Sequence, residues 1–187
     1  SPPSVDFFAL CFALLKTGLV PVMVDPAIGL RNVTDCIHES QPEIFLGNTL
    51  THLIRKIYKW EKDSIKVNTT IPQLLRTTHY APPNPHLVSP NSPTAIIYTS
   101  GSTGLPKGAI YTNENFSAQL DMLRATFDIH EDEIDLPTFP LFALIDILLG
   151  VTSVIPDMRF PPPAKVDPAK VTDAIRRFNV TNMFASP

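Results

Sequence analysis

The apolar positions in the first third of the chain alternate between two patterns, one typical of helices and one typical of buried strands. Helical patterns occupy residues 5–16, 30–40 and 49–60, and short continuous apolar runs separate them at 20–25 and 43–47. Short apolar runs of this kind are typical of strands in a buried parallel sheet. The order helix, strand, helix therefore predicts a mostly parallel sheet covered by helices.

The same alternation continues after two interruptions. Proline-rich stretches at residues 82–93 and 156–168 cannot continue a helix or a central strand, so we predict loops there. The remaining expected elements are strands at 65–67, 94–99 and 109–111, a helix at 113–127, a strand at 135–139, a helix at 141–149, a strand at 151–155, a helix at 169–178 and a strand at 180–185. The predicted fold class is α/β, with helix-covered and mostly parallel sheets.

Composition narrows the class of protein. A chain of 187 residues can bury one sizeable core, and 44% hydrophobic with 18% charged residues is typical of a packed globular domain. The formal net charge is -3, and the 15 Lys and Arg residues are spread along the chain. Nucleic acid is therefore not an expected partner.

Cysteines, histidines and the longest apolar stretch argue against disulfide-bonded, membrane-spanning and metal-binding classes of protein. Cys11 and Cys36 lie inside apolar-periodic segments, which predicts buried free thiols and fits a reducing cytoplasm. Residues 7–24 are interrupted by Lys16 and Pro21, so no transmembrane segment is expected. The five histidines show no metal-ligand spacing, so no metal site built from protein side chains is predicted.

One loop carries the clearest chemical signal. Of the seven glycines, three fall within residues 101–108, where hydroxyl side chains and Lys107 accompany them. Glycines let backbone N–H groups approach an anion, hydroxyls donate to phosphate oxygens, and a lysine supplies a counter-charge. This combination favours a polyphosphate ligand, although composition alone also allows an ordinary surface turn.

The loop differs from the common nucleotide-binding loops. Pro106 stands where a Walker loop has its second glycine, and Gly108 follows Lys107 where Ser or Thr is required. A Walker loop also opens a helix, whereas Lys107 leads into a β-type run at residues 109–111. We therefore predict a strand-loop-strand flap.

The string Tyr98-Thr-Ser-Gly-Ser-Thr-Gly-Leu-Pro-Lys-Gly108 resembles, nearly letter for letter, the signature loop of the adenylate-forming superfamily. That superfamily includes acyl-CoA synthetases, firefly-type luciferases and peptide-synthetase adenylation domains. Residues 7–25 resemble its upstream helix and strand, and Pro140-Leu-Phe142 resembles its next motif. The resemblance implies that a carboxylate attacks the α-phosphorus of ATP to give acyl-AMP and pyrophosphate. ATP is thus the expected cofactor, and Mg²⁺ is inferred from ATP chemistry.

The resemblance also implies roles for individual residues. The residues expected to bind the β- and γ-phosphates are Thr99, Ser100, Gly101, Ser102, Thr103, Gly104 and Lys107. Lys107 is also the expected catalytic residue. Phe142 and Ala143 are the expected residues of the substrate pocket. Ala143 stands where the family often has a ring at the acyl pocket, and Asn113 stands where it often has a histidine. These differences are explained either by a different substrate, since a small residue leaves room in the pocket, or by drift at tolerant positions. We attribute Asp135 and Asp146 to a helix N-cap or to solvent contact.

Three strings resemble one branch of the superfamily, the β-lactone synthetases of bacterial long-chain olefin biosynthesis. They are Phe139-Pro-Leu-Phe-Ala-Leu144, Val154-Ile-Pro-Asp-Met158 and Ala164-Lys-Val-Asp-Pro-Ala-Lys170. This likeness implies a long-chain β-hydroxy acid as the substrate, whose own hydroxyl closes a β-lactone and releases AMP. A fatty acyl-CoA or acyl-AMP ligase is the alternative.

Both ends of the chain look cut, so residues 1–187 are expected to be a partial AMP-binding N-terminal domain without the mobile C-terminal domain. The superfamily's magnesium-binding glutamate, ribose-binding aspartate and C-terminal lysine lie downstream of a position such as Pro187. This chain alone is therefore not expected to complete adenylation. The alternative to an enzyme is a catalytically silent nucleotide-binding module.

Overall fold

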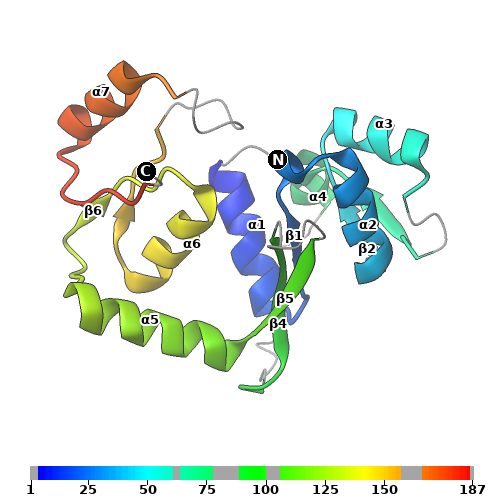
Figure 1. Ribbon diagram of the computed structural model, residues 1–187, viewed down its shortest axis with the longest axis horizontal. Helices are drawn as coiled ribbons and strands as arrows, with labels where there is room; N and C mark the ends of the chain where they lie inside the picture. The colour runs from blue at the N-terminus through cyan, green and yellow to red at the C-terminus, as the bar shows by residue number, and fades with distance from the viewer. Residues whose placement is uncertain (1–3, 61–63, 78–88, 100–105, 157–165, 186–187) are drawn as a thin grey trace. The chain divides into compact units, whose positions relative to one another are not determined.

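A computed structural model describes residues 4–60, 64–77, 89–99, 106–156 and 166–185. The chain divides into two compact units, one ending at Asn113 and one beginning at Glu114, and each is described by itself. Strand pairings are parallel in three of the four ladders, and helices alternate with the strands along the chain (Figure 1). The α/β fold class predicted from the hydrophobic pattern is confirmed.

A three-stranded sheet of order β1-β4-β5 organises the first unit. Strand β1 (Val22–Val24) pairs in parallel with β4 (Pro93–Thr99), and β4 pairs antiparallel with β5 (Lys107–Thr112). Helix α1 (Val5–Lys16) lies beside this sheet (Figure 1). The loop at residues 100–105 therefore joins two antiparallel strands, as predicted from the apolar run that follows Lys107.

A second, two-stranded ladder belongs to the same unit. Its strands β2 (Ile44–Leu46) and β3 (Val67–Thr69) run parallel. The helices around it are α2 (Leu30–Ser40), α3 (Thr49–Tyr58), α4 (Ile71–Thr77) and the 3₁₀ turn η1 (Pro26–Ile28). The pattern of apolar positions predicted α2 and α3 but missed α4 and η1, because both are too short to show a helical period.

A small core joins α2 to its neighbours. Val33 and Ile37 of α2 are buried against Trp60, and the side chains packed around this cluster are Val24, Ile28, Phe45 and Ile54. The buried indole Nε1 donates a hydrogen bond of 2.8 Å to Thr34 Oγ1, so its polar atom is satisfied inside the core. This packing fixes α2 against both β1 and β2.

The second unit combines helices with one short parallel ladder. Its elements are α5 (Asn113–Phe127), which starts at the boundary, β6 (Ile134–Asp135), α6 (Pro140–Leu149), β7 (Thr152–Ser153) and α7 (Pro168–Phe178). Strands β6 and β7 are parallel. Leu136, Val154 and Ala174 form the buried core, so α7 packs on the residues that follow the two strands.

Several expected strands differ from the observed ones. The strand expected at 65–67 is β3 at Val67–Thr69, and the strand expected at 151–155 is reduced to β7 at Thr152–Ser153. The strand predicted at 135–139 is β6 alone, because Pro137 has no backbone N–H with which to continue the ladder. The strand predicted at 180–185 is wrong as a regular element, since only Asn182 forms a bridge, with Asp135. Backbone bonds from Leu136 N to Asn182 O and from Thr138 N to Phe184 O still hold this segment along β6 and the residues after it.

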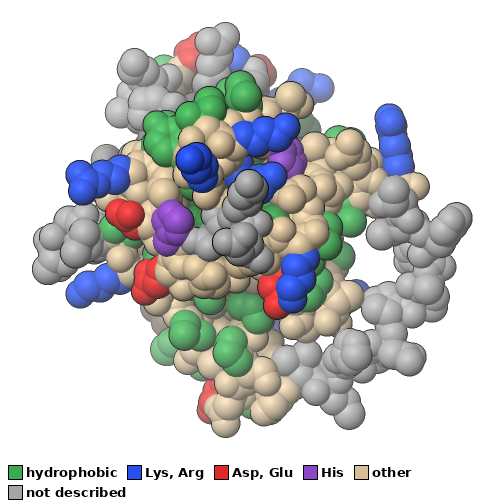
Figure 2. Space-filling model, turned by 90° about the vertical axis from the view of Figure 1, so that its right-hand side faces the viewer, with side chains coloured by type: hydrophobic (Ala, Val, Ile, Leu, Met, Phe, Trp, Pro, Cys, Tyr) green, Lys and Arg blue, Asp and Glu red, His purple; other side chains and the backbone are tan. Residues whose placement is uncertain are grey.

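Both cysteines are free and buried, which confirms the expectation for Cys11 and Cys36. Burial raises the pKa of the Cys11 thiol to about 11, so it stays protonated near neutral pH. None of the described helices has the length and apolar character needed to cross a membrane. On the face of the molecule drawn in Figure 2, Lys and Arg side chains lie at several places among hydrophobic, acidic and other side chains.

Gly108 matters for the packing of the β4–β5 ladder. It is paired with Tyr98, whose side chain is only 5% exposed. A Cβ atom on Gly108 would lie 3.0 Å from Tyr98 Cζ and 3.2 Å from Ile96 Cγ2. The absence of a side chain at this position therefore lets the tyrosine ring lie over β5.

We predict that Gly108→Ala destabilises the fold by about 1–3 kcal/mol, because the added methyl group crowds a ring that is buried on the sheet. Urea unfolding measures this change. Ala109→Ser on the same strand is the matched control, because Ala109 is exposed, and its effect should stay within about 0.5 kcal/mol. An unchanged unfolding midpoint for Gly108→Ala would contradict this account of the packing.

Candidate functional site

The two ends of the glycine-containing loop lie opposite each other. Thr99 is the last residue of β4, Lys107 is the first residue of β5, and the two are paired across the ladder with both side chains exposed. The other expected phosphate ligands, Ser100 to Gly104, lie outside the described residues. The structure thus brings together a hydroxyl and an ammonium group at the mouth of the loop, as an anion site requires.

Tyr98 anchors the β4 end of the loop. Its hydroxyl donates a hydrogen bond of 3.1 Å to Glu39 Oε2 on α2. Burial, aided by the contact with Glu39, raises the pKa of Tyr98 to about 12, so the phenol stays neutral and can donate. Analysis of the sequence missed Glu39, because it precedes Tyr98 by 59 positions and no local pattern links the two residues.

The expected residues of the substrate pocket lie on α6, in the second unit. The Phe142 ring is half-buried and packs against Phe184, with the ring centroids 4.0 Å apart, and against Phe139 at 5.9 Å. Ala143 is 0% exposed. Helix α6 therefore presents Phe142 at the surface of an aromatic cluster and turns Ala143 inward.

Two carboxyl groups in this unit contradict the interpretation drawn from the sequence. Asp135 on β6 and Asp146 on α6 are each 8% exposed, so solvent contact does not account for either. Neither is a helix N-cap, since Phe139 precedes α6 and Asp146 lies inside that helix. Asp135 pairs with Ser153 across the β6–β7 ladder, and the Ser153 hydroxyl donates to Asp146 Oδ2 at 2.8 Å, so the two carboxyl groups are neighbours.

Burial is the main reason why both carboxyl groups hold their protons more strongly than usual. It raises the pKa of Asp146 to about 7, and the neighbouring Asp135 adds to the shift although the Ser153 bond opposes it. The pKa of Asp135 is also raised by burial. No sequence signal could have identified this pair, because the two residues are 11 positions apart on different elements.

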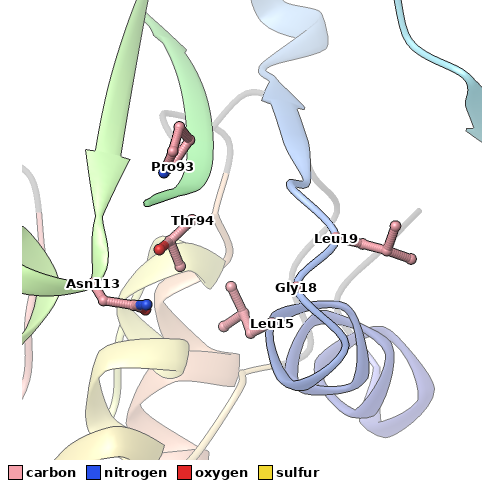
Figure 3. A pocket seen from close by; sticks show the side chains of 6 residues that line it. All are labelled: Leu15, Gly18, Leu19, Pro93, Thr94 and Asn113. Carbon is pink, nitrogen blue, oxygen red and sulfur yellow. The ribbon is translucent and has the colours of Figure 1, made fainter. Parts of the chain in front are cut away.

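A small cavity lies at the opposite end of β4 from Thr99. It measures about 10 Å³ and is lined by Leu15, Gly18, Leu19, Pro93, Thr94 and Asn113. The side chains of Leu15, Thr94 and Asn113 face one another there (Figure 3). This volume holds roughly one water molecule, so the cavity is too small for a nucleotide or an acyl chain.

Across the ranges that the structure describes, no three His, Cys, Asp or Glu side chains gather in a way that could hold a metal ion. The exposed hydroxyl and ammonium groups of Thr99 and Lys107 fit a phosphate anion, which would bring its own Mg²⁺.

Comparison with known proteins gives the family. All of residues 1–187 match the family described as AMP-binding enzyme. Olefin beta-lactone synthetase from Stenotrophomonas maltophilia (strain K279a) is 43% identical over 195 residues, covering 99% of this chain. The chain spans 35% of that relative's length.

Two solved structures share the fold. A long-chain-fatty-acid-CoA ligase from Archaeoglobus fulgidus has a TM-score of 0.82 at 18% identity, over 98% of this chain and 38% of the ligase. The o-succinylbenzoate coenzyme A synthetase from Bacillus subtilis, solved with ATP and magnesium ion, has a TM-score of 0.76 at 17% identity, over 97% and 47%. The resemblance inferred from the loop is confirmed, and this chain belongs to the AMP-binding enzyme family.

Proposed function

We propose that this chain is part of the large N-terminal domain of an ATP-dependent adenylate-forming ligase. The observation that carries the proposal is the pairing of Thr99 with Lys107 at the mouth of a glycine-containing loop between antiparallel strands. Such a loop holds an anion without a helix N-terminus. The enzyme activates a carboxylic acid by attack on the α-phosphorus of ATP, which forms acyl-AMP and releases pyrophosphate.

The loop residues act by electrostatics. Thr99, Ser100, Gly101, Ser102, Thr103, Gly104 and Lys107 bind the β- and γ-phosphates in this proposal, with Mg²⁺ bound to the nucleotide. Negative charge builds up on the leaving pyrophosphate, and donors that already point at it stabilise the transition state. Lys107 supplies the positive charge, and the Tyr98–Glu39 bond keeps β4 in place beneath the loop.

The proposed acid is a long-chain β-hydroxy acid, whose hydroxyl attacks the acyl-AMP carbonyl, closes a β-lactone and releases AMP. The 43% identity to an olefin beta-lactone synthetase supports this substrate class, as does the apolar cluster of Phe142, Phe139 and Phe184. A fatty acyl-CoA or acyl-AMP ligase is the alternative. The two buried thiols, Cys11 and Cys36, fit the reducing cytoplasm that we propose as the location.

Lys107→Ala and Ser102→Ala in the full-length protein should each slow ATP–pyrophosphate exchange by about 10²–10³-fold, because each removes a group to which the proposal assigns stabilisation of the developing charge. Lys66→Ala is the matched control, since Lys66 forms an exposed ion pair of 3.1 Å with Glu43 and should exchange at the wild-type rate. A wild-type rate in either loop variant would remove that residue from the site.

Product analysis separates the two substrate proposals. The full-length protein is incubated with ATP and a long-chain β-hydroxy acid in the absence of coenzyme A, and the products are identified by mass spectrometry. We expect AMP and a β-lactone, because the acid carries its own nucleophile. Strict dependence on coenzyme A would instead establish an acyl-CoA ligase.

A further inference from the structure

The contact between Asp135 and Asp146 requires a proton. Two ionised carboxylates have only acceptor atoms, so a hydrogen bond between them forms only when one is protonated. Both side chains are buried, and Ser153 links them, because it pairs with Asp135 across the β6–β7 ladder and its hydroxyl donates to Asp146. We infer that Asp135 and Asp146 share one proton, and that the pair positions the aromatic wall of Phe142 and Phe184 against which the acid binds.

The proton lies on Asp146. The backbone N–H groups of Leu136 and Phe184 beside the Asp135 carboxyl oppose the rise of its pKa and so favour its ionised form. Asp146 accepts a bond from the Ser153 hydroxyl, so its other oxygen can donate to Asp135. The pair thus connects β6, α6, β7 and the segment after α7.

Among the described residues, no cationic side chain forms an ion pair with Asp135 or Asp146. Glu133 adds negative charge that raises the pKa of Asp135 further. Arg124 of α5 donates to the Leu149 carbonyl at 3.1 Å instead of to either carboxylate. The charged side chains of α7, at Lys170, Asp173, Arg176 and Arg177, are exposed. Within the described part of the chain, neither aspartate has an ion-pair partner, so loss of the proton would leave two buried like charges in contact.

Two routes connect the pair to the aromatic wall. Asp135 forms a backbone bridge with Asn182, two residues before Phe184, and the Phe184 carbonyl accepts bonds from Thr138 N at 2.9 Å and Thr138 Oγ1 at 3.2 Å. These bonds fix the Phe184 ring against Phe142. Asp146 lies three residues after Ala143, on the same buried side of α6. Repulsion between ionised Asp135 and Asp146 would therefore shift both rings.

The inferred role depends on the proposed function, because it takes Phe142 as part of the acid-binding pocket. It makes Asp135 and Asp146 positioning residues, since neither touches the reacting atoms. The shared proton also sets the direction in which the stability of the fold changes with pH. The pKa of Asp146 in the folded chain, about 7, exceeds its ordinary value of 3.8. The contribution of protonated Asp146 to the stability of the fold is therefore complete at pH values below 3.8 and is lost as the pH rises through about 7.

Asp146→Asn in the full-length protein tests the shared proton, because its amide can donate to Asp135 but cannot ionise. Melting temperatures are measured at several pH values between about 5 and 8. We expect the melting temperature of the wild type to fall relative to that of Asp146→Asn as pH rises. Asp173→Asn, on the exposed surface of α7, is the control that should follow the wild type. Parallel profiles for the wild type and Asp146→Asn would overturn the shared proton.

Kinetics with the β-hydroxy acid test the positioning role. With rising pH, the wild-type kcat/KM for the acid should fall by roughly 10- to 100-fold, while the KM for ATP stays constant. Asp146→Asn should keep its low-pH value, and Asp146→Ala should be impaired at every pH. A fall of kcat/KM in the wild type and Asp146→Asn alike would overturn the role. If Asp146→Asn fails to fold, Asp135→Asn replaces it, because this change also removes the contact between two ionisable groups.

The two sets of measurements keep the proposals separate. Absence of ATP–pyrophosphate exchange at every pH would refute the proposed function, and with it the positioning role. The melting profiles would still decide whether Asp135 and Asp146 share a proton, because they require no substrate. A pH-dependent melting difference with an unchanged kcat/KM would refute the positioning role alone.

Discussion

The antiparallel backbone pairing of β4 with β5 holds Thr99 and Lys107 opposite each other at the two ends of one loop. A loop that binds an anion through backbone N–H groups works only if its ends are fixed, because the donors must converge. The ladder depends in turn on the packing of Tyr98 over Gly108 and on the hydrogen bond from Tyr98 to Glu39. The first unit is therefore organised around the support of this loop.

Both units use burial to keep an acid protonated so that it can donate a hydrogen bond. In the first unit the donor is the Tyr98 phenol, whose pKa of about 12 keeps it neutral at physiological pH. In the second unit it is Asp146, whose pKa of about 7 lies within the physiological range. The same physical cause, desolvation of the charged form, thus gives a contact that is insensitive to pH in one unit and a sensitive contact in the other.

Much of the fold could be predicted from the sequence, because helical periodicity is a local property. The predicted bounds of α1, α2 and α5 agree with the structure, and the strand-loop-strand flap followed from the apolar residues after Lys107. Helix α4 and the true extent of the strands could not be predicted. Those features depend mainly on a short segment's partners in the fold. The end of β6 is the exception, because Pro137 is visible in the sequence and its missing N–H argues against a longer strand.

The family and the loop residues could be identified without a structure, because the string from Tyr98 to Gly108 is continuous in the chain, and the hydrophobic pattern predicted the α/β class. The support of Tyr98 by Glu39, the inward position of Ala143 and the meeting of Asp135 with Asp146 became visible only in the folded chain. Desolvation explains why the carboxyl pair could not be foreseen. An acidic residue is expected at the surface when only the sequence is known. Its protonation depends on which distant elements exclude water from its carboxyl group.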